Sequence, residues 1–358
     1  MKVLIVKVSS LGDVIHTLPA LSDARSAIPA IEFDWVTEEA FTEVPAWHPA
    51  VSKVIPVALR RWRKSWLGIF FNREFKAFKK SLQASKYDLV IDAQGLLKSG
   101  FICSLTRGRV AGFDKDSIRE KIATRFYDDC YAVSWQQHAV ERTRELFAKA
   151  LGYSIENRSA DYGINLQQFG KTNSKATGKS LLFLHGTTWE TKLWPEAYWI
   201  QLSRKARADE IAVNLLWGND LEKQRATRIA ASVPGVKVLD KLTLTEIAAH
   251  MMQTQAVVAV DTGLAHLAAA LDRPMVAMYG PSDAQRTGTY GRHQLHLSAT
   301  LPCSPCLNKI CYYRGEDLNE SEKARIFSVQ PPCFSTLNPD LVWARLNDLI
   351  SEARAGCA

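Results

Sequence analysis

The chain has 358 residues, of which 47% are hydrophobic, and it carries a formal net charge of +8 at pH 7. It is too long for one small core and rich enough in apolar side chains to build two, so we expect two domains. The moderate positive charge suits an anionic partner, whether a phosphate, a nucleic acid or a lipid headgroup, but it does not choose among them.

The N-terminal segment, residues 1–8, becomes polar after few residues and lacks a small-residue cleavage site, which predicts a strand and not a secretion signal. No stretch approaches the roughly 18 to 20 apolar residues that are needed to span a bilayer. We therefore expect a cytoplasmic protein whose contact with a membrane is peripheral.

Short apolar runs rich in β-branched residues alternate with longer segments of helical period, which predicts α/β domains with parallel sheets covered by helices on both faces. In the first half of the chain, we expect strands at residues 3–8, 33–37, 53–57, 89–92 and 110–113, with the clearest helices at 72–85 and 137–151.

Periodicity fades over residues 152–179, and 170–174 read Gly-Lys-Thr-Asn-Ser, so we expect a linker there. Beyond it, a second doubly wound domain is predicted. Its expected strands are residues 181–185, 211–217, 236–239, 256–260 and 275–279. Two such domains in tandem would place a ligand crevice at the carboxyl ends of their strands.

The first predicted strand leads into Ser9-Ser10-Leu11-Gly12-Asp13, where a dinucleotide-binding fold would carry G-x-G-x-x-G. That fingerprint is absent, which disfavours a nicotinamide or flavin enzyme. Asp13 has two interpretations. It is either a helix N-cap or first-turn acid that stabilises the helix dipole, or a general base that takes a proton from an attacking hydroxyl.

In the second domain, an apolar strand ends at Asp261 and is followed by Thr262, Gly263 and a helix that contains His266. The free N–H groups and positive end of such a helix suit a diphosphate. Gly263 lets the backbone approach closely, and His266 could reach a phosphate or a sugar hydroxyl. The structural alternative is a capped helix in which Asp261 holds the loop.

The loop at residues 185–195 also lies between a strand and a helix, and it is the candidate for binding donor phosphates. Thr187 and Thr188 offer hydroxyl donors and Lys192 a positive charge, which together could neutralise a leaving diphosphate without a metal.

A third strand end in this domain carries Trp217, which could contact a nucleotide base, and Glu222, which could accept hydrogen bonds from ribose hydroxyls. For Glu222, a solvated carboxylate at a helix start is an equal alternative.

Residues 60–80 combine large aromatics with eight Lys or Arg and a single acid, Glu74, and they begin with the cations Arg60, Arg61, Arg63 and Lys64. Such a surface fits an anionic headgroup with acyl chains below it. Single-stranded nucleic acid would suit the same composition, and the structural alternative is a helix with one basic exposed face and one packed face.

Four of the seven cysteines, Cys303, Cys306, Cys311 and Cys333, form C-x2-C-x4-C with a distant fourth member. Zinc or an iron–sulfur cluster could use this spacing, but it lacks a second C-x2-C pair. We expect reduced thiols that pack a late loop, and no metal.

Three stretches resemble the lipopolysaccharide heptosyltransferases of glycosyltransferase family 9. They are KVLIVKVSSLGDVIHTLPAL near the N-terminus, QQHAVERTRELFAKALGY at 136–153 and VDTGLAHLAAALDRP at 260–274. The middle stretch and the Arg60 region favour the type I enzymes over type II.

The resemblance implies a GT-B fold, in which two doubly wound Rossmann-like domains face each other across a cleft. Residues 1–165 would bind the acceptor, residues 180–335 would bind ADP-heptose, and a helix at 338–353 would pack back on the N-terminal domain. It also implies inverting transfer of L-glycero-D-manno-heptose from ADP-heptose to the inner Kdo of Kdo2-lipid A. The enzyme would be a monomer without cofactor or nucleic-acid partner, peripheral on the cytoplasmic face of the inner membrane.

By matching positions, the resemblance implies that Asp13 is the catalytic base and that Lys192 assists catalysis at the phosphates. The donor site would comprise Thr187, Thr188, Trp217, Glu222, Asp261, Thr262, Gly263 and His266, while Arg60, Arg61, Arg63 and Lys64 would meet the acceptor's phosphate and carboxylates. The resemblance ends near residue 295, so the role of the cysteine segment stays open.

Two other function classes are compatible with parts of the sequence. A sugar-nucleotide epimerase of similar fold would consume the donor without an acceptor and would not need the basic aromatic segment. A nucleic-acid-binding protein would use that segment alone, with strongly salt-dependent retention on single strands.

Overall fold

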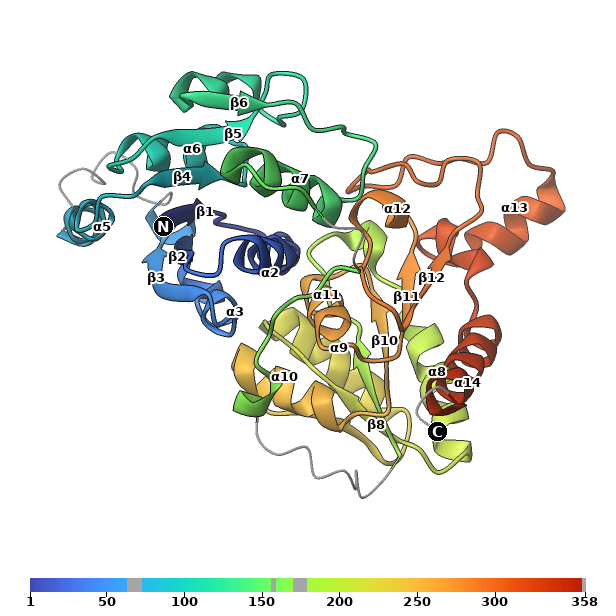
Figure 1. Ribbon diagram of the computed structural model, residues 1–358. Helices are drawn as coiled ribbons and strands as arrows, with labels where there is room; N and C mark the ends of the chain where they lie inside the picture. Colours follow the sequence, from blue (N-terminus) through green and yellow to red (C-terminus); the bar gives the residue numbers. More distant parts are fainter. Residues whose placement is uncertain (63–72, 156–158, 170–178, 356–358) are drawn as a thin grey trace. The chain divides into compact units, whose positions relative to one another are not determined.

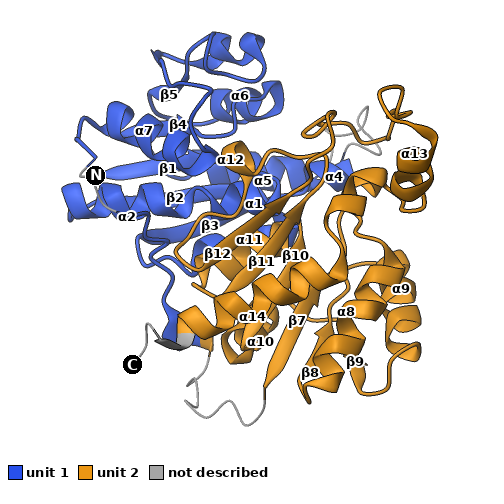
Figure 2. Cartoon of the chain, turned by 90° about the vertical axis from the view of Figure 1, so that its right-hand side faces the viewer, with its two compact units in different colours: residues 1–168 blue, residues 169–358 orange. Residues whose placement is uncertain are grey.

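The computed structural model describes residues 1–62, 73–155, 159–169 and 179–355. Contacts within the chain divide it into two compact units, residues 1–168 and 169–358 (Figure 2). The division falls inside the stretch 152–179 that we predicted to be a linker. Arg63 and Lys64, two of the predicted acceptor-binding residues, lie outside the described residues.

The first unit contains a six-stranded parallel sheet in the order β3-β2-β1-β4-β5-β6. Its strands are β1 (Lys2–Val6), β2 (Glu32–Glu38), β3 (Val51–Val57), β4 (Leu89–Asp92), β5 (Val110–Phe113) and β6 (Asp129–Tyr131). The five strands predicted here are confirmed, with small differences at their ends. The sixth, β6, is a partly exposed edge strand of only three residues, too short to show a hydrophobic pattern.

Helices cover both faces of this sheet, as its buried strands require. They are α1 (Leu11–Ile15), α2 (Leu18–Ala27), α3 (Glu43–Ala46), α4 (Leu59–Trp62), α5 (Arg73–Gln83), α6 (Leu97–Ser104) and α7 (Ala139–Leu151). Side chains alternate along each strand: Leu4 and Val6 join the cluster that contains Phe75 of α5 and Ile102 of α6. On β2, Phe33 instead contacts Phe147 of α7.

The second unit repeats the architecture with the strand order β12-β11-β10-β7-β8-β9. Its strands are β7 (Ser180–Leu184), β8 (Ala212–Leu215), β9 (Val236–Val238), β10 (Ala256–Val260), β11 (Met275–Tyr279) and β12 (Gln294–Ser298). All five predicted strands are confirmed. The additional strand β12 is a partly exposed edge strand, so it carries no continuous apolar run.

Seven α-helices accompany this sheet among the described residues (Figure 1). They are α8 (Glu196–Ala208), α9 (Asp220–Ala231), α10 (Leu244–Gln253), α11 (Gly263–Ala270), α12 (Ala284–Thr287), α13 (Glu320–Phe327) and α14 (Pro339–Ala355). No helix in the described part of the chain is long and apolar enough to cross a bilayer.

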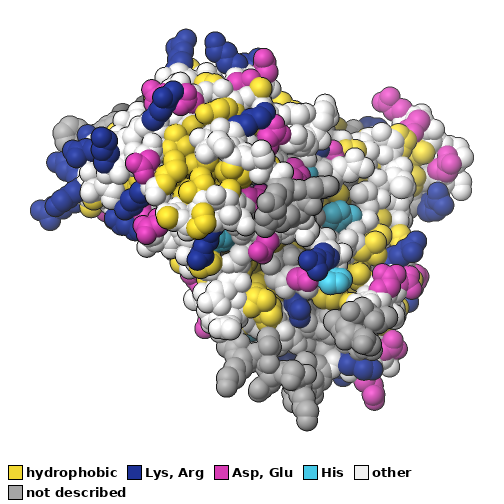
Figure 3. Space-filling model, viewed as in Figure 1, with side chains coloured by type: hydrophobic (Ala, Val, Ile, Leu, Met, Phe, Trp, Pro, Cys, Tyr) yellow, Lys and Arg dark blue, Asp and Glu magenta, His cyan; other side chains and the backbone are white. Residues whose placement is uncertain are grey.

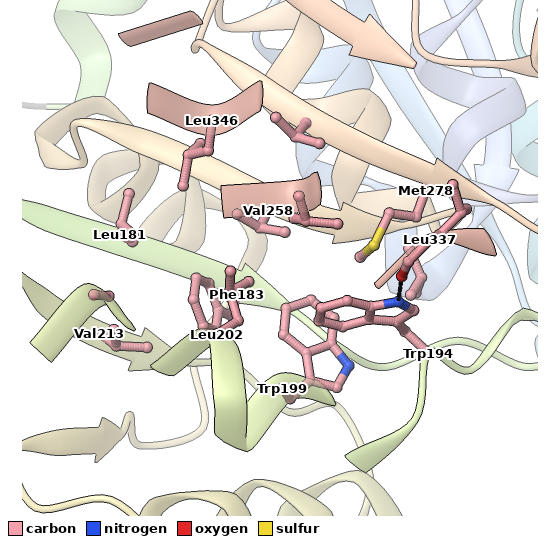
Figure 4. Close-up of a cluster of buried hydrophobic side chains, with 14 of the residues drawn as sticks. Leu181, Phe183, Trp194, Trp199, Leu202, Val213, Val258, Met278, Leu337 and Leu346 are labelled. Carbon is pink, nitrogen blue, oxygen red and sulfur yellow. Dashed lines mark hydrogen bonds between the residues drawn. The ribbon is translucent and has the colours of Figure 1, made fainter. Parts of the chain in front are cut away.

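The C-terminal helix α14 belongs to the second unit. It packs against α8 and strands β10 to β12, and Val342 and Leu346 are fully buried in that unit's core. Figure 4 shows Leu346 in this cluster. Just before the helix, the carbonyl oxygen of Leu337 accepts a 2.8 Å hydrogen bond from Trp194 Nε1. The apolar stripe of this helix thus completes the core around Trp194. The prediction that residues 338–353 pack back on the N-terminal domain stays a prediction.

Each sheet has one point at which the order of strands reverses direction. It lies between β1 and β4 in the first unit and between β10 and β7 in the second. In doubly wound sheets, ligands bind beyond the carboxyl ends of the strands at such a point. The loops that follow these four strands are therefore the places to look for chemistry.

Candidate functional site

In the second unit, the loops that follow β7 and β10 lie together because the two strands are hydrogen-bonded neighbours. Thr187 Oγ1 donates to the carbonyl oxygen of Asp261 at 3.0 Å, and Lys192 Nζ lies 2.6 Å from Asp261 Oδ2. Two segments more than sixty residues apart in sequence thus form one cluster of a hydroxyl, an ammonium group and a carboxylate.

Asp261 is the centre of this cluster. It is buried, and His266 Nε2 lies 4.0 Å from its other carboxylate oxygen. A buried carboxylate needs a charged or hydrogen-bonding partner, and Lys192 supplies one. The prediction that Asp261 holds the loop and the prediction that it belongs to a polar site are therefore compatible.

Helix α11 opens directly onto this cluster. Thr262 is extended, with φ −148° and ψ 158°, and its side chain does not cap the helix that begins at Gly263. The N–H groups of a first helical turn without a side-chain cap, together with the helix dipole, bind anions well. The site therefore combines a cation, hydroxyls and a helix N-terminus, which is a set suited to a diphosphate.

Glu222 joins the same edge of the sheet from the start of α9. Its Oε2 accepts a 2.7 Å hydrogen bond from the backbone N–H of Gly218, and Asn219 caps the helix by accepting from the Glu222 N–H. A Cβ atom on Gly186 would lie only 2.7 Å from Glu222 Cδ. This glycine therefore lets the carboxylate lie directly against the loop after β7.

The remaining predicted donor residues lie at the margin of this arrangement. Thr188 is exposed on the loop after β7. The ring nitrogen of Trp217 donates to the carbonyl oxygen of Leu239 at 2.8 Å, and Lys223 Nζ lies 4.6 Å from the ring centroid. Trp217 is thus held in place by the residue that follows β9 and by a lysine of α9.

In the first unit, Asp13 lies in the loop and helix that follow β1, one of the two strands at the switch point of that sheet. Its Oδ2 accepts hydrogen bonds from Ser10 N at 2.8 Å and from Ser10 Oγ at 2.7 Å. These bonds close a capping box at the start of α1, so the first-turn interpretation describes its local structure. The half-buried carboxylate lies at the switch point as well, which keeps the general-base interpretation open.

Two lysines and a glutamine surround this loop, and sequence reasoning missed all three. Gln94 Oε1, from the loop after β4, accepts from the backbone N–H groups of Val8 and Ser9 at 3.0 Å each. Lys98 Nζ donates to Ser9 Oγ at 3.1 Å. The sequence did contain a signal for Gln94 and Lys98, because both follow the predicted strand at 89–92 and ligands bind beyond the carboxyl ends of such strands.

The third residue, Lys7, is buried at the end of β1 and donates to the carbonyl oxygen of Ala93 at 2.7 Å. Burial lowers the pKa of its ammonium group, while Asp13 and Asp92 act in the opposite direction. Burial likewise lowers the pKa of Lys98, opposed in part by Glu38. Two lysine side chains thus lie near the loop that carries Asp13, and burial disfavours the charged form of both.

Comparison with known proteins decides the family. The family model for glycosyltransferase family 9 (heptosyltransferase) matches residues 75–315. Lipopolysaccharide heptosyltransferase 1 of Pseudomonas aeruginosa is 50% identical over 354 residues, 98% of each chain. The chain belongs to glycosyltransferase family 9, the heptosyltransferases.

Further proteins that are similar to this chain are also heptosyltransferases. Lipopolysaccharide heptosyltransferase 1 of Escherichia coli K12 is 49% identical over 82% of this chain and 92% of its own. The solved structure of E. coli heptosyltransferase WaaC with ADP has 48% identity and a TM-score of 0.78, covering 84% of this chain and 94% of that chain. A second WaaC structure contains ADP-2-deoxy-2-fluoro heptose and has a TM-score of 0.77 at 49% identity, with the same coverage of both chains.

These similarities confirm the predicted GT-B class of fold, and they favour the transferase over the epimerase and the nucleic-acid-binding alternatives.

The two described cations at the start of the basic segment, Arg60 and Arg61, have different surroundings. Arg61 forms ion pairs with Glu39 at 3.1 Å and with Glu74 at 2.7 Å, so its charge is compensated within the unit. The guanidinium of Arg60 instead lies 5.1 Å from the ring centroid of Phe41.

Helix α5 has the amphipathic form given as the structural alternative. Phe75 and Phe78 pack edge-on against Trp62, with centroid distances of 5.9 and 5.7 Å. The cations of the opposite face are exposed, and Lys and Arg side chains project there in Figure 3. They are Arg73, Lys76, Lys79 and Lys80.

The cysteine segment lies beside β11. Cys333 is buried, and burial raises the pKa of its thiol to about 12. A Cβ on Gly280 would lie 2.8 Å from Cys333 Sγ, so the glycine makes room for the sulfur. Within the described ranges, no group of three or more His, Cys, Asp or Glu side chains is arranged to hold a metal ion.

Proposed function

We propose that this heptosyltransferase moves L-glycero-D-manno-heptose from ADP-heptose to the inner Kdo of Kdo2-lipid A, with inversion at the anomeric carbon. The observation that carries the proposal is the cluster of Lys192, Thr187 and Asp261 at the uncapped start of α11. It has the charge and hydrogen-bonding groups that a sugar diphosphate requires, and relatives about half identical to this chain have been solved with ADP and with an ADP-heptose analogue.

The reaction is a single displacement. The acceptor hydroxyl transfers its proton to the Asp13 carboxylate as its oxygen forms a bond to the anomeric carbon of the heptose. The bond between that carbon and the β-phosphate oxygen breaks on the opposite face, and ADP leaves with the electron pair. One base and no covalent intermediate are needed, and the configuration at the anomeric carbon inverts.

Negative charge develops on the β-phosphate as ADP leaves. Lys192, the hydroxyls of Thr187 and Thr188 and the first turn of α11 would stabilise that charge, because groups fixed before the reaction need no reorganisation during it. Glu222 would accept hydrogen bonds from the ribose hydroxyls. His266 would reach the sugar or a phosphate.

The acceptor is anionic, and the first unit offers the charges to receive it. Lys98 lies beside the loop of Asp13, and Arg60 follows β3. The exposed cations of α5 would meet phosphates of lipid A at the cytoplasmic face of the inner membrane, where basic side chains are attracted to anionic headgroups. We expect a monomer to suffice, because each binding group comes from one chain.

The test is ADP release by the purified protein from ADP-heptose, with and without Kdo2-lipid A. Release that requires the acceptor, together with a heptosylated lipid A product of inverted configuration, supports the proposal. Loss of ADP-heptose without acceptor, or no turnover with this acceptor, contradicts it. A lipid A that lacks Kdo serves as the control acceptor.

A further inference from the structure

Three consecutive residues of the cysteine segment, Leu307, Asn308 and Lys309, contact the loops of the donor site, and we call them the 307–309 clasp. Leu307 N donates to the carbonyl oxygen of Pro281, just beyond β11, at 2.7 Å. The carbonyl oxygen of Asn308 accepts a 2.7 Å hydrogen bond from Thr191 Oγ1. The clasp thus ties the loop that carries Lys192, which follows β7, to the segment just beyond β11, two strands away in the sheet.

The backbone of the clasp is held in an unusual conformation. Leu307 has a φ of +56°, a left-handed geometry that costs roughly 1 kcal/mol or more for a residue with a side chain. Such a conformation persists where surrounding contacts impose it, and the bonds to Pro281 and Thr191 are those contacts. These contacts therefore also fix the backbone that carries Lys309, two residues further along the chain.

Lys309 shares an aromatic platform with Lys192. The Lys192 ammonium lies 4.3 Å from the ring centroid of Trp189, and that of Lys309 lies 5.5 Å from the same centroid. Both cations are thus gathered at one indole in the loop after β7. A ring face attracts cations, so Trp189 can hold two ammonium groups near the donor site despite their mutual repulsion.

The charge balance of the donor site calls for a second cation. Lys192 is paired with Asp261 at 2.6 Å, so the pair contributes little net charge, and a helix N-terminus adds only about half an elementary charge. Among the residues that the structure describes, no carboxylate forms an ion pair with Lys309. Its charge is available for an anion.

We propose that Lys309 is a second phosphate-binding cation of the donor site, positioned by the clasp and by Trp189. Its ammonium group contacts the diphosphate of the sugar nucleotide and leaves Lys192 free to keep its bond with Asp261. The inference rests on the proposed function, since it assigns a further residue to the same donor site.

Substitution of Lys309 tests this assignment. Lys309→Met keeps most of the side chain and removes the charge, and because Lys309 is exposed, the fold and Tm should not change. We expect the Kd for ADP, measured by calorimetry at low salt, to rise roughly tenfold, as for the loss of one charge-assisted hydrogen bond. The Kd for adenosine, which lacks phosphates, should stay the same. Lys309→Arg should restore ADP binding.

Two further variants separate binding from a structural effect. Lys323→Met removes a lysine of α13 that pairs with Glu320, and it should bind ADP as the unmodified chain does. Thr191→Val breaks the bond to Asn308 and should weaken ADP binding in part, while Thr191→Ser should not. Equal ADP affinity in Lys309→Met and the unmodified chain overturns the assignment while leaving the transferase proposal standing. Failure of the unmodified chain to bind ADP overturns both.

Discussion

Asp13 has a structural role at the start of α1 that is compatible with its proposed role as the general base. Oδ2 is engaged by both donors of Ser10, and these bonds fix the orientation of the side chain at the switch point of the first sheet. A general base must be held at the reacting hydroxyl. The capping box therefore serves the proposed base, and the two interpretations of the residue do not compete.

We expect Asp13→Asn to lower kcat by about 10² to 10⁴, the usual range for loss of a general base. The amide cannot take the acceptor's proton, but it can still accept hydrogen bonds from Ser10, so Tm should fall little. The Kd for ADP should not change, because the donor groups lie in the second unit. Steady-state kinetics, calorimetry and thermal unfolding give the three values.

The matched control for Asp13 is Ser10→Ala, which removes one of the two hydrogen bonds and leaves the carboxylate. It should cost no more than about tenfold in kcat, the effect of a modest misplacement of the base. If Ser10→Ala and Asp13→Asn lower kcat equally, Asp13 acts through the loop and not as a base.

At the scale of the elements, the strand ends carry the site, and β7 illustrates what holds them. His185 directly follows this strand, is fully buried, and lies edge-on to Trp199 of α8 with a centroid distance of 6.5 Å. Burial, with a further contribution from Arg225, lowers the pKa of His185 to about 4. The anchor of the donor loop is thus a neutral imidazole.

This buried imidazole predicts acid sensitivity. Between the unfolded pKa of about 6.5 and the folded pKa of about 4, the unfolded chain binds more protons, so the free energy of unfolding falls as pH is lowered through this window. The loss from His185 is on the order of 3 kcal/mol when complete. Chemical denaturation at a series of pH values measures it.

His185→Gln is the comparison for that experiment. It should be less stable at neutral pH because the packing against Trp199 changes. Between pH 6.5 and pH 4, however, its free energy of unfolding should fall less steeply with decreasing pH, because the variant lacks the one proton that His185 takes up on unfolding. Parallel curves for the two chains in this range would show that His185 does not titrate as described.

At the scale of the molecule, the two units have separate hydrophobic cores, and in the proposed function the first unit receives the acceptor and the second binds the donor. Helix α14 is part of the second unit, because Val342 and Leu346 are buried in that unit's core. Lys205 of α8 adds an ion pair to Asp340 at 2.5 Å. The stability of the second unit therefore depends on α14.

Leu346→Ala should destabilise the second unit by about 2 to 5 kcal/mol, the range for removing a buried leucine side chain. If the second unit binds ADP as proposed, ADP should raise the unfolding temperature of that unit, which identifies the affected transition in calorimetry. Arg345→Ala, at an exposed position on the same helix, is the control and should change stability little. A drop confined to a transition that ADP does not shift would contradict the assignment of α14.

The sequence by itself determined the local features of this protein. Apolar runs of strand length marked ten of the twelve strands in the described residues. The polar residues that follow these runs marked Asp13, Thr187, Lys192 and Asp261, because both signals depend only on neighbours along the chain. The two missed strands, β6 and β12, are edge strands, whose partly exposed side chains leave little hydrophobic pattern.

Only the tertiary structure decided which of these local features meet. Lys192 pairs with Asp261 because β7 and β10 are neighbours in the sheet, Gln94 and Lys98 reach the loop of Asp13 because β4 lies beside β1, and the 307–309 clasp reaches Trp189 from more than a hundred residues away. The apolar face of α14 likewise indicates that the helix is buried, but it does not indicate which surface the helix packs against. Strand order and non-local packing are properties of the folded chain, since periodicity records that a side chain is buried but not which surface covers it.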